Sequence, residues 1–153
     1  MEASNKKKKD HKKFFEEKTF SRPFALQEIK KNINIDCTEI SKLSTKQIIN
    51  KAIRFHQEGN IINAEEYYKY LITQGCRNHS IFSNYGSILK TLGKFKEAEL
   101  FQRMAIDLKP DFSNAHYNLG NLLKDLGKLE EAEISTCKAI ELNPDYFNAY
   151  LSL

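Results

Sequence analysis

The sequence of 153 residues contains no tryptophan and only three cysteines, three prolines and six glycines. The cysteines Cys37, Cys76 and Cys137 are odd in number, lie far apart and form no CxxC pair. This pattern argues against the disulfide framework of a secreted protein and favours a reducing, cytoplasmic environment. The four histidines do not cluster with the cysteines at the spacing of metal ligands, so we expect neither a metal nor a cofactor.

Long apolar runs are absent as well. No stretch approaches the roughly 18 consecutive apolar residues that cross a membrane. The lysines at positions 6–9 precede no apolar segment, which argues against a secretory signal peptide. The sequence therefore predicts a soluble protein with no membrane partner.

The net charge of +4 is concentrated near the N-terminus. Residues 1–31 carry ten lysines and arginines against five acids, whereas residues 32–153 carry fourteen against fifteen. We interpret residues 1–44 as a basic, largely disordered segment, with a short helix over residues 24–33 that could dock on the domain that follows. Its lysines suit nucleic acid, but the acids among them make a solvated tail the favoured interpretation.

The sequence does contain an internal repeat with a period of 34 residues. Glycine and alanine recur at this interval, in the columns Gly59, Gly93, Gly127 and Ala64, Ala98, Ala132. The second and third units agree at 15 of 34 positions and the first and second at only five, so the first unit is degenerate. A period of 34 is the signature of a solenoid of helical hairpins. We expect an all-α domain over residues 45–153, with units at 45–78, 79–112 and 113–146 and a partial fourth at 147–153.

Each unit reads as two helices joined at a glycine. In the second unit, apolar residues spaced by three and four define one face of each helix, comprising Phe82, Tyr85, Gly86 and Leu89, then Phe95, Ala98, Phe101, Ala105 and Leu108. Gly93 suits the end of the first helix, and Pro110 stops the second. Before the first unit, residues 44–47 match a capping box.

Small residues recur where two helices of a hairpin would cross. Ala52, Gly86 and Gly120 occupy one column of the first helices. Glycine inside a helix costs roughly 1 kcal/mol against alanine, so Gly86 and Gly120 predict a close helix crossing.

The chain resembles the tetratricopeptide repeat (TPR) family, most clearly in three segments of the third unit, residues 118–123, 126–132 and 139–144. The resemblance covers residues 45–153. It implies a right-handed solenoid of antiparallel helical hairpins, with the first helices along a concave side that binds extended peptides or helices of other proteins. The first unit departs from the family pattern, because Lys51 stands in an apolar column and Cys76 replaces the closing proline.

One column of the first helices has no obvious packing reason, namely Asn50, Asn84 and Asn118. An asparagine amide can pair with the C=O and the N–H of a peptide unit together. Helices about 10 Å apart would place one asparagine every third residue of a strand that rises about 3.3 Å per residue. The column is similar to the asparagine ladder in the superhelix of protein O-GlcNAc transferases. The alternative is that these amides bond locally between helices.

The other candidate contacts surround this column. They are Ser87, Lys90, Asn114, Asn121 and Lys124, and the lysines suit acidic side chains. For each of these residues, a solvated helix face is an equally good interpretation. The basic residues that other TPR domains use to clamp chaperone C-termini are missing, because Ile49 or Ser83 stands where the first lysine would be.

The expected function is therefore non-catalytic protein binding on the concave face, as a scaffold or adaptor. No small-molecule substrate is expected, since helical solenoids of this size offer no deep pocket. One alternative is the substrate-recruiting portion of a larger glycosyltransferase-like enzyme. The end at Leu153, inside the fourth unit, also suggests self-association through an uncapped end.

Overall fold

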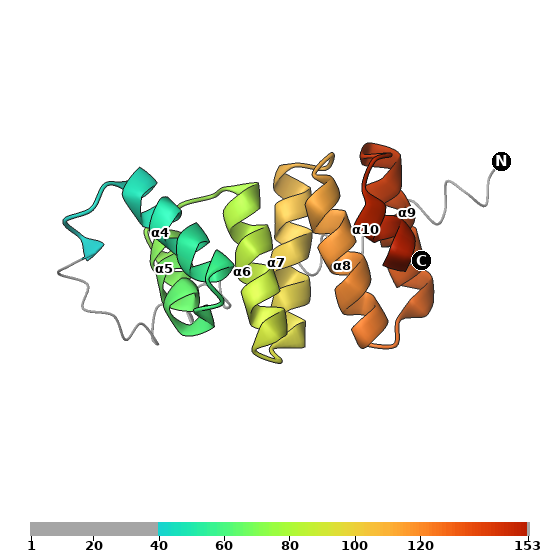
Figure 1. The fold of residues 1–153 in the computed structure, drawn as a ribbon, viewed down its shortest axis with the longest axis horizontal. Helices are drawn as coiled ribbons and strands as arrows, with labels where there is room; N and C mark the ends of the chain where they lie inside the picture. The colour runs from blue at the N-terminus through green and yellow to red at the C-terminus, as the bar shows by residue number, and fades with distance from the viewer. Residues whose placement is uncertain (1–39, 153) are drawn as a thin grey trace. The chain divides into compact units, whose positions relative to one another are not determined.

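The computed structural model describes residues 40–152. This part of the chain contains seven helices and no strand, in the order α4 (Thr45–Gln57), α5 (Ile61–Thr73), α6 (His79–Thr91), α7 (Phe95–Leu108), α8 (Ser113–Asp125), α9 (Leu129–Leu142) and α10 (Phe147–Ser152). Figure 1 shows three hairpins stacked in chain order, with α10 beside the third. The predicted all-α solenoid is confirmed. The predicted tail and the helix over 24–33 lie outside the described residues.

Local sequence signals set the limits of the helices. α4 begins at the predicted capping box, where the Ser44 hydroxyl accepts from the Gln47 N–H at 3.3 Å and the Gln47 side chain accepts from the Ser44 N–H at 2.8 Å. Gly59, Gly93 and Gly127 follow the first helices with φ of 73°, 72° and 72°. Only glycine adopts this left-handed conformation without strain, so the chain can turn directly into the second helix of each hairpin.

The first hairpin ends differently from the next two. Its last turn closes on Gly75, with φ of 82°, and the Cys76 N–H donates to the Leu71 carbonyl at 3.0 Å. This bond belongs to the glycine-based ending common in helices. A glycine turn therefore ends α5, in the place where Pro110 ends α7 in the next hairpin.

The predicted core of the second hairpin is largely confirmed. Phe82, Tyr85 and Phe101 are buried, and the Phe101 ring centre lies 4.8 Å from that of Tyr85 and 5.7 Å from that of Phe82. The prediction was wrong for Phe95 and Leu108, which are 38% and 46% exposed. These are the first and last residues of α7, where the helix extends past its crossing with α6.

The predicted close crossing is also present. A Cβ built on Gly86 would lie 2.7 Å from Nε2 of Gln102 and 3.2 Å from the carbonyl oxygen of Ala98. A Cβ on Gly120 would overlap the hydroxyl oxygen of Thr136. Helices of successive hairpins also pack against each other. The first helices α6 and α8 are in direct contact, and this contact is more extensive than the one between the second helices α7 and α9. The first helices α6 and α8 thus form a continuous layer.

Candidate functional site

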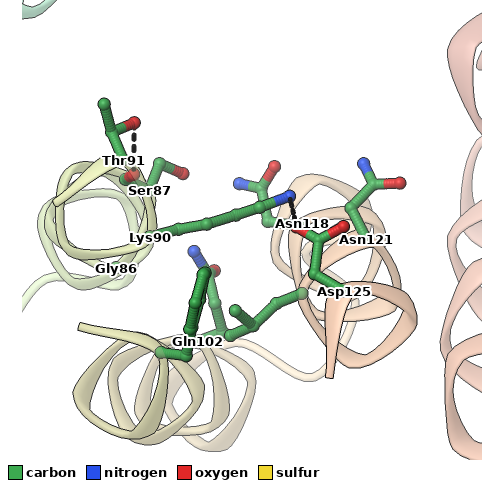
Figure 2. A pocket seen from close by; sticks show the side chains of 10 residues that line it. Gly86, Ser87, Lys90, Thr91, Gln102, Asn118, Asn121 and Asp125 are labelled. Atoms are coloured by element: carbon green, nitrogen blue, oxygen red, sulfur yellow. Dashed lines mark hydrogen bonds and ion pairs between the residues drawn. The ribbon is translucent and has the colours of Figure 1, made fainter. Parts of the chain in front are cut away.

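A groove of about 440 Å³ lies between α6 and α8, with α7 beneath it. Four of the predicted residues, Ser87, Lys90, Asn118 and Asn121, line this groove (Figure 2). The other lining residues are Gly86, Thr91, Phe95, Gln102, Leu122 and Asp125. We call this the first groove.

The floor of the first groove is a buried polar network. The Ser83 hydroxyl donates to Gln102 Oε1 at 2.8 Å, and Gln102 Nε2 donates to the Ser83 carbonyl at 2.8 Å. Both residues are 1% exposed. Asn118 Nδ2 donates to the Ser83 hydroxyl at 3.2 Å, which ties α8 to the network. Because the buried side chains of Ser83 and Gln102 both have hydrogen-bond partners, the network fixes the position of the groove wall.

An ion pair crosses the rim of the first groove. Lys90 Nζ, from α6, lies 2.8 Å from Oδ2 of Asp125 on α8 (Figure 2). On the α6 side, the Thr91 hydroxyl donates to the Ser87 carbonyl at 3.2 Å. Lys90, which was expected to face a ligand's acid, therefore already has a carboxylate partner.

A second groove, of about 300 Å³, repeats the first one hairpin later. Gly120, Asn121, Lys124, Leu129, Thr136 and Ser152 line it, each 34 residues after a residue of the first groove; Ala132 and Glu133 complete it. Asn121 lines both grooves. Lys124 Nζ donates to the Ser152 carbonyl at 3.0 Å.

The asparagine column makes contacts between helices. Asn84 Nδ2 donates to the Tyr68 hydroxyl at 3.2 Å, as Asn118 Nδ2 does to Ser83. These bonds are the local alternative considered for the column. Asn50 is exposed on α4, and Asn114 is exposed in the first turn of α8 and lines neither groove. Among residues 40–152, the Oδ1 atoms of Asn84 and Asn118 accept no hydrogen bond and stay available to a ligand.

Sequence reasoning missed Gln102, Ser83 and Asp125. No residue type recurs at their positions, since Tyr68 and Thr136 stand one unit before and after Gln102. The one available signal was Gly86, whose missing side chain makes room for Gln102.

In the first hairpin, Tyr68 is fully buried and the His56 ring lies edge-on to it, with the ring centres 6.3 Å apart. Burial lowers the pKa of His56.

Ion pairs between successive hairpins hold the grooves in register. Lys94 Nζ lies 2.8 Å from Glu65 Oε1, and Lys128 Nζ lies 2.9 Å from Glu99 Oε2. Burial alone would raise the pKa of both carboxyl groups. The positive charges of Lys94 and Lys69 at Glu65, and those of Lys128 and Arg103 at Glu99, outweigh burial and lower both pKa values below the ordinary value of a glutamate. We call these two contacts the lysine–glutamate ladder.

Within residues 40–152, no group of three or more histidine, cysteine, aspartate or glutamate side chains could hold a metal ion. In the same part of the chain, no helix combines the length and the apolar character that a membrane crossing needs.

Comparisons with known proteins identify the repeats. The family model described as Tetratricopeptide repeat matches residues 79–112 and 113–146. No curated protein matches the chain. The hairpin at residues 45–78 lies outside the family match, yet it has the same architecture.

Several solved structures are similar to the chain. The second TPR domain of human RPAP3, in complex with an HSP70 peptide, is 27% identical with a TM-score of 0.62, over 69% of this chain and 88% of that one. The first TPR of Spaghetti (RPAP3), bound to an HSP90 peptide, has 24% identity and a TM-score of 0.66, over 72% and 90%. The O-GlcNAc transferase of Thermobaculum terrenum is 28% identical with a TM-score of 0.67, over 71% of this chain but only 22% of the enzyme.

Proposed function

The chain is a tetratricopeptide repeat protein, and we propose that it is a non-catalytic interaction module that binds an extended segment of a partner protein along its two grooves. One observation carries this proposal. The second groove uses the same wall positions as the first, 34 residues later. A ligand that spans both grooves therefore meets similar chemistry at a regular interval, as an extended peptide with its regular backbone requires.

The groove walls suit a peptide rather than a small molecule. The Asn118 Oδ1 atom can accept from a backbone N–H, and the Asn121 amide can both donate and accept. Phe95 and Leu129 line the grooves and are 38% and 64% exposed, so each offers an apolar surface to a ligand side chain. Amide groups beside a partly exposed apolar wall match the polar backbone and the apolar side chains of an extended segment.

The structural neighbours support peptide binding in general. Two of the similar structures hold peptides of HSP90 and HSP70. In this chain, Ser83 stands where the clamp's first lysine would be, and it is buried under Asn118 and Gln102. We therefore propose a partner segment other than an acidic chaperone tail.

A displayed library of random 12-residue peptides tests the proposal. Selection on the full chain should enrich peptides that bind the Asn121→Ala variant at least fivefold more weakly. Asn121 lines both grooves, and its side chain has no hydrogen-bond partner among residues 40–152, so its loss should leave stability unchanged. Asn63→Ala is the matched control, since Asn63 is exposed on α5 and lines neither groove. Equal weakening by both variants, or no enrichment at all, would refute groove binding.

The likeness to the Thermobaculum terrenum enzyme supports a second candidate, the substrate-recruiting portion of a glycosyltransferase-like protein. In that case the asparagine column would read the peptide backbone, and binding would depend little on peptide sequence. Library selection separates the two candidates. A shared sequence motif among the enriched peptides favours the specific module, whereas broad enrichment that Asn118→Ala abolishes favours the recruiting role.

A further inference from the structure

We propose that Asp125 is a selectivity residue that makes the first groove reject acidic ligand side chains. The inference rests on the proposed function, because it concerns which peptides the groove accepts. The ion pair between Lys90 and Asp125 carries it, together with the position of Asp125 at the end of α8.

The lining of the first groove carries one positive and one negative side chain. Among its lining residues, Lys90 is the one cation and Asp125 the one anion, and their charged atoms lie 2.8 Å apart. A ligand carboxylate that approaches Lys90 must compete with Asp125 for the ammonium group. It must also approach the charge of Asp125 itself, and like charges at such distances repel.

The position of Asp125 supports a specific role. Asp125 is the last residue of α8, where the helix dipole disfavours a negative charge. One unit earlier, Thr91 occupies the corresponding place at the end of α6. A carboxylate at this locally unfavourable place is therefore particular to the α8 side of the first groove, where it faces Lys90.

The test is a parallel selection of the random 12-residue library on the full chain and on its Asp125→Asn variant. Peptides enriched by Asp125→Asn should contain more aspartate and glutamate than those enriched by the unchanged protein. An individual acidic peptide from that selection should bind the variant about fivefold more tightly, the size expected for one half-exposed charge pair. The gain should shrink at 1 M salt, where screening acts within about 3 Å.

Two further variants separate selectivity from a merely structural role. Lys90→Gln combined with Asp125→Asn removes both charges and should cancel the gain for acidic peptides. Asp111→Asn makes the same charge change at an exposed position outside both grooves and should leave the selected peptides unchanged. A structural role would lower the melting temperature of Asp125→Asn without changing which peptides it selects.

The outcomes distinguish this inference from the proposed function. If neither protein enriches any peptide, groove binding itself fails, and the selectivity fails with it. If both proteins enrich the same peptides with equal acid content, the proposed function stands and the role of Asp125 is wrong. That role is equally wrong if Asp111→Asn changes the selected peptides as much as Asp125→Asn does.

Discussion

The first and second hairpins place side chains of different size at the same structural position. In the first hairpin this position holds Tyr68, whose buried ring packs against His56 and whose hydroxyl accepts from Asn84 Nδ2. In the second it holds Gln102, which folds back onto Ser83 beside an open groove. The same position on the second helix thus holds a buried aromatic ring in the first hairpin and an amide that lines a groove in the second.

Truncating that position should affect the two hairpins unequally, and this is the largest effect we predict. Tyr68→Ala removes a fully buried aromatic side chain and should lower the free energy of unfolding by about 4 kcal/mol. Gln102→Ala leaves the Ser83 hydroxyl without its acceptor and should cost about 1–2 kcal/mol. Urea denaturation followed by circular dichroism measures both. Equal losses would mean that the two positions are equivalent after all.

The helix crossing gives the next largest effect. Gly120→Ala places a Cβ against the Thr136 hydroxyl, which is fixed by its bond to the Ala132 carbonyl at 2.9 Å. Alanine's better helix propensity offsets about 1 kcal/mol of the resulting strain, so we expect a net loss of about 2 kcal/mol. Adding Thr136→Ala should recover most of it. In the first hairpin, Ala52→Gly should instead cost about 1 kcal/mol, because there the crossing already accommodates a Cβ.

The lysine–glutamate ladder makes stability depend on pH. Glu65 and Glu99 have pKa values below the ordinary value of a glutamate in the folded chain, so their stabilising contribution is present above the unfolded pKa. It is lost as pH falls through the lower folded pKa. Unfolding free energy should therefore fall below about pH 4.5, and replacing either glutamate by glutamine should flatten the fall. Glu130→Gln, at an exposed position outside the ladder, is the control and should leave the slope unchanged.

The smallest predicted effect concerns how the second helices start. Asn60 caps α5 with its own side chain, which accepts from the Asn63 N–H at 3.3 Å. Lys94 precedes α7 without a side-chain cap and reaches back to Glu65 instead. Lys94→Asn should gain a cap of about 1 kcal/mol and lose a partly exposed ion pair of similar size. The free energy of unfolding should change by less than about 0.5 kcal/mol, while its dependence on salt concentration should weaken. A large loss of stability would show that the ion pair of the lysine–glutamate ladder contributes more than a helix cap.

The parts of this fold that were predictable from the sequence depend on signals between residues close together in the chain. The capping box at Ser44 and the glycine turn at Gly93 act within a few residues of chain, and both were identified from sequence alone. The walls of the grooves were identified in part, because Asn118 belongs to a column that recurs every 34 residues and Asn121 lies next to that column on the same helix. Gln102 and Asp125 were missed because their partners, Ser83 and Lys90, lie 19 and 35 residues away and no repeated motif marks the pairs.

The bond from Asn118 to Ser83 has a consequence for any ligand of the first groove. An exposed asparagine samples several rotamers, and a partner that binds it must stop that motion at a cost of about 0.5–1.5 kcal/mol. Asn118 is already held by its amide nitrogen, at 3.2 Å from a hydroxyl that is itself buried. Its Oδ1 atom therefore points in one direction before a peptide arrives. The contact that first suggests a purely internal role thus lowers the entropic cost of recognition.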